Sequence, residues 1–219
     1  EGTTTAIVGP SGSGKTTLTS LMARFWDVDS GAVKLGGIDV KDYALDSLMH
    51  NFSMVFQRVY LLNDSIENNI KFGKPDATHE EAVAAAKAAR CHDFITALPD
   101  GYDTIIGESG ATISGGERQR LSIARALARR PEILVFDDSF SALDYRTDTR
   151  LRAGLDRELK DTTRLIVAQR IGTIRNADKI IVLDEGRMVG MGTHEELMQT
   201  CPIYQEIARS QLSQEELGA

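Results

Sequence analysis

Residues 9–16 read GPSGSGKT and follow the apolar run TTTAIVG at residues 3–9. The pattern GxxxxGK[ST] between a strand and a helix is the arrangement in which backbone N–H groups surround a phosphate. Glycines let the backbone turn inward, and the N-terminus of the next helix adds the positive end of its dipole. A chance Gly-rich turn is the alternative, but the strand before the loop and the helical periodicity after it favour a phosphate-binding loop.

Two side chains of this loop carry specific chemistry. Lys15 is placed to reach the β- and γ-phosphates of a nucleotide, and the hydroxyl of Thr16 is a candidate Mg²⁺ ligand. A nucleotide with Mg²⁺ is therefore the expected ligand. The loop residues expected to contact the nucleotide are Gly9, Ser11, Gly12, Ser13, Gly14, Lys15, Thr16 and Thr17.

The composition is that of an ordinary globular domain. The chain has 219 residues, of which 42% are hydrophobic and 26% charged, and its net charge is −7. This length can bury a substantial core, and the acidic balance disfavours a nucleic-acid partner. No apolar run approaches the roughly 18 residues of a membrane span. Cys91 and Cys201 have no ligand spacing, so we expect buried or free thiols in a reducing compartment.

Strand and helix patterns alternate along the chain, as in an α/β domain. Three near-continuous apolar runs are typical of strands in a parallel sheet that is covered on both faces. They are EILVFD at residues 132–137, RLIVAQ at 164–169 and KIIVLD at 179–184. Residues 15–26 are expected to form one helix, because their apolar positions recur at helical spacing. Since the chain enters a strand directly after Glu1, we expect it to be a fragment of a longer protein.

The middle of the chain has a different pattern. Between residues 58 and 129 the periodicity is helical, with a capping box at Thr78 and Glu81 before an alanine-rich run. We expect a single domain over residues 1–219. In it, 1–57 and 130–219 form the parallel-sheet core, and 58–129 form an inserted helical subdomain.

Residues 113–120, ISGGERQR, combine a helix start with two glycines. Ser114 and Glu117 form an S-x-x-E capping box, which any helix can use. Gly115 and Gly116, however, leave the backbone N–H groups of the helix start uncovered, so that they can bind an external phosphate. The motif is moderately specific alone, and it gains weight beside the phosphate loop.

ILVFDDSFSALD, residues 133–144, is an apolar strand that ends in two acids and then turns. If the strand belongs to a nucleotide hydrolase, its last residue, Asp137, is suited to hold Mg²⁺. The next carboxylate, Asp138, is then placed to help a water molecule attack a phosphate. Aspartate is a short side chain for that task.

Taken in order, these motifs resemble the nucleotide-binding domains of the ATP-binding cassette family. The resemblance rests on the phosphate loop, Gln57 in VFQ, the ISGGE signature, the strand to Asp137 and the SALD turn, and it covers essentially the whole chain. It implies a P-loop NTPase (RecA-like) fold whose first edge strands precede Glu1. It also implies a head-to-tail dimer, with ATP between the phosphate loop of one domain and the signature helix of the other.

Roles follow from the resemblance residue by residue. It makes Gln57 a link between Mg²⁺ and the membrane-domain interface and lets Asp137 hold Mg²⁺ through water. The implied metal site therefore consists of Thr16, Gln57 and Asp137. The further residues implied to contact nucleotide are Ser114, Gly115, Gly116, Glu117 and Asp144. The stretch GESG, from Gly107 to Gly110, resembles the short loop with which exporter-type cassettes touch transmembrane coupling helices.

Two positions depart from the family pattern. The residue after the magnesium aspartate is normally a glutamate, and here it is Asp138; the switch histidine of the family is replaced by Gln169. Aspartate lacks one methylene, and a misplacement of about 1 Å can cost roughly a hundredfold in rate. Glutamine donates a hydrogen bond but cannot become cationic. We therefore expect a hydrolytically impaired site; the alternative is a slow but competent one with a repositioned backbone.

The nearly intact signature predicts a non-identical partner. One half of a heterodimeric exporter would contribute a degenerate site of its own and a working signature to the other site. We accordingly expect an ATPase domain at the cytoplasmic face of a membrane, attached through transmembrane domains near Gln57. A homodimer with two slow sites is the nearer alternative.

Cassette ATPases of DNA maintenance and translation are the more distant alternative. Those with long coiled-coil arms insert them between the phosphate loop and the signature, yet only 57 positions separate Gln57 from Ser114. No such arm fits in that interval. Translation-type relatives usually carry two cassettes in one polypeptide, which a fragment does not rule out. The transported substrate is not indicated by any of these residues.

Overall fold

The structure is a computed structural model that describes residues 1–107 and 113–217, with side chains described up to residue 211. In this part of the chain, six strands form one sheet in the order β4-β5-β6-β1-β7-β8. Neighbouring strands are parallel apart from β7 and β8, which are antiparallel. The strands are β1 Thr4–Val8, β4 Phe52–Val55, β5 Ile133–Asp137, β6 Thr163–Val167, β7 Lys179–Asp184 and β8 Arg187–Gly192. The predicted parallel α/β core is thus confirmed.

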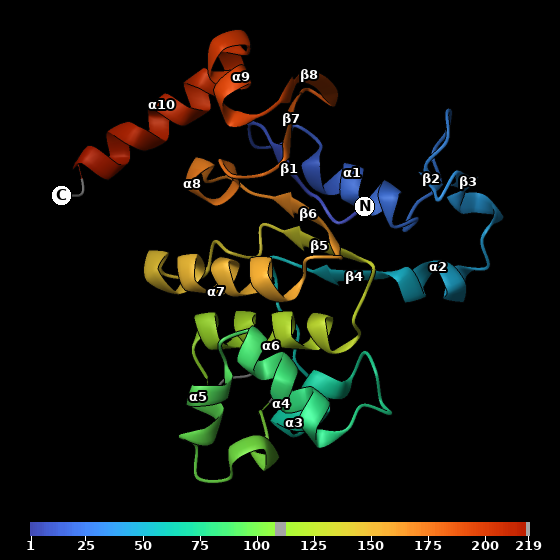
Figure 1. The fold of residues 1–219 in the computed structure, drawn as a ribbon, viewed down its shortest axis with the longest axis vertical. Helices are drawn as coiled ribbons and strands as arrows, with labels where there is room; N and C mark the ends of the chain where they lie inside the picture. Colours follow the sequence, from blue (N-terminus) through green and yellow to red (C-terminus); the bar gives the residue numbers. More distant parts are fainter. Residues whose placement is uncertain (108–112, 218–219) are drawn as a thin grey trace.

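Helices surround this sheet (Figure 1). Along the long axis, α9 and α10 lie at the end that also carries β8, whereas α3 to α6 gather at the opposite end beyond β4. The helices are α1 Lys15–Met22, α2 Leu45–Asn51, α3 Ile66–Lys71, α4 His79–Ala88, α5 His92–Thr96, α6 Gly115–Ala128, α7 Tyr145–Glu158, α8 Ile171–Ile174, α9 His194–Thr200 and α10 Pro202–Leu217. Shorter pieces are the hairpin β2 Lys34–Leu35 and β3 Ile38–Asp39 and the 3₁₀ turns η1 Val40–Asp42 and η2 Gly101–Asp103.

The largest group of buried apolar side chains joins the sheet to the helices. Leu134 and Phe136 of β5 belong to it together with Leu121 of α6 and Leu151 of α7, and none is more than 1% exposed. Burying a side chain of this size stabilises the fold by about 1.5–3 kcal/mol. Since β5 lies in this core, the position of Asp137 at its end is fixed by packing.

Helix α1 is shorter than predicted. Residues 15–26 were expected to be helical, but α1 ends at Met22 and Arg24 adopts a left-handed φ of 56°. The guanidinium group of Arg24 donates to Val40 O at 3.0 Å and to Tyr43 O at 3.2 Å. These distant carbonyls hold Arg24 outside the helix. The expectation was wrong here because helical periodicity does not reveal tertiary hydrogen bonds.

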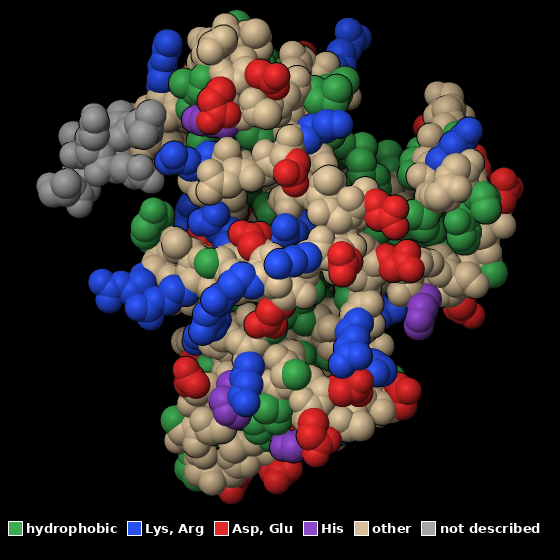
Figure 2. Space-filling view, in the orientation of Figure 1, with side chains coloured by type: hydrophobic (Ala, Val, Ile, Leu, Met, Phe, Trp, Pro, Cys, Tyr) green, Lys and Arg blue, Asp and Glu red, His purple; other side chains and the backbone are tan. Residues whose placement is uncertain are grey.

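Charges of both signs are interspersed over the face seen in Figure 2, with Lys and Arg most frequent along its middle. Within the described residues, no helix is both long enough and apolar enough to cross a bilayer.

Candidate functional site

The loop between β1 and α1 has a shape that only glycine permits at three positions. Gly12 and Gly14 have φ of +78° and +95°, where side chains are disfavoured. A Cβ on Gly9 would lie 2.0 Å from Leu183 O, so a side chain is excluded there as well. The turn after β7 also closes on the loop, because Gly186 N donates to Ser13 O at 3.1 Å. These contacts place the predicted phosphate loop against the β7–β8 turn.

The ammonium group of Lys15 lies within this loop. Its Nζ donates to Gly9 O at 2.9 Å and to Pro10 O at 2.8 Å. Burial lowers the pKa of Lys15, while the carboxylates of Asp138 and Asp137 raise it. A phosphate entering the loop would meet a cation already directed toward the turn of the backbone.

Thr16 and Asp137 meet at the C-terminal edge of the sheet. Thr16 Oγ1 donates to Asp137 Oδ1 at 3.0 Å. Burial raises the pKa of Asp137, and the hydrogen bond from Thr16 and the charge of Lys15 lower it. A hydroxyl and a carboxylate at one point are the hard oxygen ligands that Mg²⁺ prefers. In the described residues no three His, Cys, Asp or Glu side chains converge as a metal site, so Mg²⁺ here would also need oxygens from phosphate or water.

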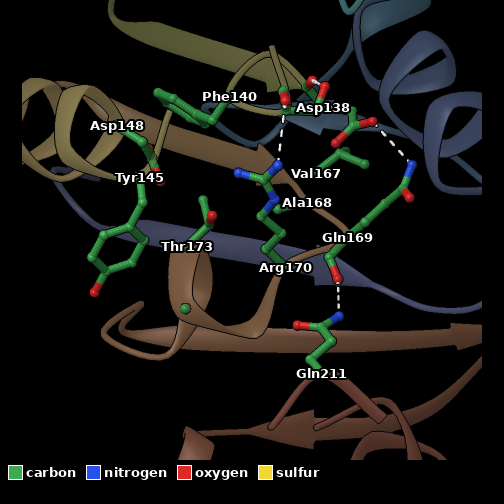
Figure 3. A pocket seen from close by; sticks show the side chains of 12 residues that line it. Asp138, Phe140, Tyr145, Asp148, Val167, Ala168, Gln169, Arg170, Thr173 and Gln211 are labelled. Carbon is green, nitrogen blue, oxygen red and sulfur yellow. Dashed lines mark hydrogen bonds between the residues drawn. The ribbon is translucent and has the colours of Figure 1, made fainter. Parts of the chain in front are cut away.

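Asp138 joins two glutamines from different parts of the chain. Its Oδ2 accepts from Gln57 Nε2 at 2.8 Å and from Gln169 Nε2 at 3.0 Å, the latter visible in Figure 3. Asp138 has a left-handed φ of 50°. Burial raises the pKa of Asp138, as does the charge of Asp137; Arg170, Lys15 and the Gln169 hydrogen bond lower it. The predicted residues Gln57, Asp138 and Gln169 therefore form one cluster.

A cavity of about 420 Å³ lies beside this cluster (Figure 3). Asp138 and Gln169 line one part of it, and Tyr145 and Thr173 line another. Arg170 also lines the cavity, and its Nη2 donates to Ser141 O at 3.4 Å. The cluster thus has open space next to it on the side of α7 and α8.

The signature residues form the start of α6. The predicted capping box is present, since Ser114 N donates to Glu117 Oε2 at 2.8 Å and Glu117 N donates to Ser114 Oγ at 3.3 Å. A Cβ on Gly115 would meet no atom within 4 Å, and one on Gly116 would lie 3.7 Å from Ala142 O. The start of α6 therefore borders the SALD turn and leaves Gly115 accessible.

Asp144 stays outside the cluster, and the GESG stretch is described only at its first residue. Asp144 Oδ1 accepts from Thr147 N at 2.9 Å, so this carboxylate caps α7. The side-chain hydrogen bond with Thr147 is the main cause of the lowered pKa of Asp144. Of the GESG stretch, Gly107 is described, whereas residues 108–110 lie outside the described residues.

One residue at the site was missed by the sequence analysis. Gln211 of α10 donates from Nε2 to Gln169 O, and its Oε1 accepts from Ile171 N at 2.6 Å. No local motif marks Gln211, because its partners lie 40 or more positions away.

Comparison of the sequence with known protein families identifies the family of this chain. A family model described as ABC transporter matches residues 1–141, which is more than half of the chain. This chain belongs to the ABC transporter family. It is a nucleotide-binding domain of that family, homologous to exporter proteins.

Two relatives and one solved structure illustrate the similarity. An "ATP-dependent lipid A-core flippase" of Haemophilus influenzae is 45% identical over 213 residues, which is 97% of this ABC domain and 36% of the relative. A protein of the same name from Legionella pneumophila is 45% identical over 210 residues, 96% of this chain and 36% of that one. The structure of "a bacterial Atm1-family ABC exporter with ATP bound" superposes with a TM-score of 0.93 at 41% identity, covering 96% of this chain and 37% of the exporter. The ABC domain thus spans about a third of these proteins.

Proposed function

We propose that the chain is the ATP-binding motor domain of an ABC exporter and that it dimerises around ATP to drive transport. The observation that carries the proposal is the convergence of the phosphate loop, the Thr16–Asp137 pair and Asp138 with its two glutamines. The names of the relatives favour an exporter over the cassettes of translation and DNA maintenance. In this proposal residues 1–57 and 130–219 are the RecA-like core, and 58–129 are the helical subdomain.

Nucleotide binding is assigned to the phosphate loop. Lys15 would neutralise the β- and γ-phosphates, and the backbone N–H groups of the loop would donate hydrogen bonds to the remaining phosphate oxygens. Thr16 and Asp137 would hold Mg²⁺, with Gln57 close to the metal. When bound, Mg²⁺ offsets the negative charge that develops on the phosphates.

The hydrogen bonds of Asp138 support a slow site. A general base must direct a free lone pair at the attacking water. Oδ2 of Asp138 already accepts two amide hydrogen bonds, so of this short carboxylate only Oδ1 is left to face an attacking water. Gln169 adds no positive charge to the site, because an amide does not titrate. We therefore assign this site to ATP binding with impaired hydrolysis.

A second nucleotide-binding domain is the proposed partner, and we expect it to be non-identical. Ser114 and Gly115 are exposed, so the start of α6 is accessible to a nucleotide held by another chain. The partner's site would then combine its own phosphate loop with this chain's Ser114, Gly115 and Gly116.

Transmembrane domains are the second class of proposed partner. The segment next to Gln57 exposes Phe56, Tyr60 and Leu62 at 44%, 68% and 40%, respectively. Exposed apolar side chains that lie close together are typical of a protein interface. We place the contact there and at Gly107 to Gly110, on the cytoplasmic face of a membrane.

Single-site hydrolysis in the assembled full-length transporter tests the proposal. The partner's catalytic glutamate is neutralised first, so that only this chain's site can turn over ATP. We expect little residual turnover and little further change on adding Asp138→Asn. Turnover at the wild-type rate that disappears with Asp138→Asn would identify Asp138 as a working base and overturn the impaired-site proposal.

A further inference from the structure

The segment that carries Gln169 is held by a helix from the far end of the chain. Gln211 donates to the carbonyl oxygen of Gln169 and accepts from the N–H of Ile171 at 2.6 Å. One side-chain amide thus fixes the backbone on both sides of Arg170. Figure 3 shows Gln211 on one side of the Gln169 backbone and Asp138 near the other end of the Gln169 side chain.

Local sequence does not supply this restraint. Helix α8 has four residues, and its N-cap, Arg170, makes no side-chain capping hydrogen bond. The first N–H of a helix has no partner within the helix and needs one from outside. Gln211 provides it for Ile171, and it does so from α10 instead of from the preceding residue.

The other side of α8 is held by α7. Arg152 Nη1 donates to Gly172 O at 3.3 Å and to Thr173 O at 3.2 Å. Asp148, whose side chain is 3% exposed, fixes that guanidinium group through two hydrogen bonds of 2.8 and 3.1 Å. Helices α7 and α10 therefore hold α8 from two directions, as their places in Figure 1 indicate.

Helix α10 is itself anchored. Tyr204 is fully buried, and its hydroxyl lies 2.8 Å from His194 Nδ1 of α9. Ala208 is 2% exposed, and it lies on the same helix face as Tyr204 and Gln211 at spacings of four and three residues. The buried face of α10 therefore determines where the amide of Gln211 can reach.

We propose that Gln211 is a positioning residue that directs the side chain of Gln169 at Asp138, which makes α10 a structural part of the nucleotide site. The proposal rests on the proposed function, in which Asp138 and Gln169 act on the nucleotide. Glutamine suits the task because one amide offers both a donor and an acceptor. Methionine has a similar length and keeps the packing, but it makes neither hydrogen bond.

Hydrogen exchange in the full-length transporter provides the first test. Gln211→Met should speed amide exchange in the peptide that spans residues 168–174, because Ile171 N–H loses its acceptor. Gln205→Ala is the control: it removes a 2.9 Å hydrogen bond from α10 to Met198 O in α9 and has no bond to this segment. Unchanged exchange with Gln211→Met, or an equal rise with Gln205→Ala, would overturn the proposal.

The kcat for ATP hydrolysis at this chain's site gives a second test, which separates a positioning role of Gln211 from a role in packing alone. With the partner's catalytic glutamate neutralised, the double change Asp138→Glu and Gln169→His should raise kcat at this chain's site. Adding Gln211→Met should abolish that gain and leave the KM for ATP unchanged, whereas adding Gln205→Ala should preserve it. A gain that survives Gln211→Met would overturn the positioning role. If the double change gives no gain while exchange rises with Gln211→Met, the impaired-site proposal fails and the positioning of Gln169 stands.

Discussion

Thr16 and Asp137, 121 positions apart, share a hydrogen bond of 3.0 Å at the end of β5. Thr16→Val keeps the shape of the side chain and removes both this donor and a candidate Mg²⁺ ligand. We expect the affinity for MgATP to fall by about tenfold or more, by analogy with other groups that support a metal. The affinity for ATP in EDTA should change little.

Titrations of ATP with and without Mg²⁺ against the wild type and Thr16→Val would measure this. Thr149→Val on α7 is the matched control, because Thr149 is also an exposed threonine in a helix and bonds only a local carbonyl at 2.9 Å. An equal loss of affinity in EDTA would assign Thr16 to the nucleotide and not to the metal.

Lys15→Ala should abolish ATP binding at this site. The change removes the ammonium group that lies in the phosphate loop and its hydrogen bonds to Gly9 O and Pro10 O. Each hydrogen bond from this ammonium group to a phosphate would contribute about 1.5–3 kcal/mol. We therefore expect the affinity for ATP to fall by more than about a hundredfold. Equilibrium binding of a fluorescent ATP analogue measures it, with Lys34→Ala in the exposed part of β2 as the control. Unchanged affinity would contradict the assignment of the loop.

Gly115→Glu should separate folding from function. A side chain at Gly115 meets no atom within 4 Å, and the residue is the first of α6. An acidic side chain at a helix N-terminus stabilises by about 0.3–1 kcal/mol, so the free energy of unfolding should not fall. ATP turnover at the partner's site should nevertheless be lost, because a carboxylate would face the γ-phosphate there.

Chemical denaturation of the Gly115→Glu protein measures its free energy of unfolding, and an ATPase assay of the same preparation measures turnover at the partner's site. Gly115→Ala should give a smaller loss of turnover. Normal turnover with Gly115→Glu would mean that the signature does not contact the partner's nucleotide.

Much of this site could be predicted because its residues lie in short motifs. The phosphate loop, the strand to Asp137 and the capping box of Ser114 and Glu117 are local patterns with one structural solution. The position of Gln169 could be inferred only through the family resemblance. Gln211 could not be predicted, since its partners are fixed by the docking of α10 onto the rest of the domain.

Arg125→Met should destabilise the helical part of the domain. The guanidinium group donates to Asn69 O, Asn69 Oδ1 and Tyr60 O, each at 2.9 Å. Its loss removes a charged donor from the part-buried Asn69 O and Asn69 Oδ1, and a hydrogen bond to a charged group contributes about 1.5–3 kcal/mol. We expect a decrease of at least about 2 kcal/mol in the free energy of unfolding, measured in urea. Arg157→Met, on the exposed side of α7, should be nearly neutral.

Both cysteines should be inert in the folded protein. Cys91 is fully buried, Cys201 is 4% exposed, and burial raises the pKa of the Cys91 thiol to about 12. At pH 8 the Cys91 thiolate is therefore scarce as well as inaccessible. A thiol reagent should label neither cysteine in the native chain and both after unfolding. Rapid labelling of the native protein would show that this part of the core opens.

The β7–β8 turn behind the phosphate loop has a mechanical consequence. Leu183 O leaves no space for a side chain at Gly9, and Gly186 ties the loop to the turn through Ser13. A loop held in this way is rigid before the nucleotide binds. Binding is therefore not opposed by the conformational-entropy cost of ordering the loop, which is about 1–2 kcal/mol per residue. A rigid loop also changes little in conformation when the nucleotide binds. We therefore expect the conformational response to nucleotide binding to lie outside this loop.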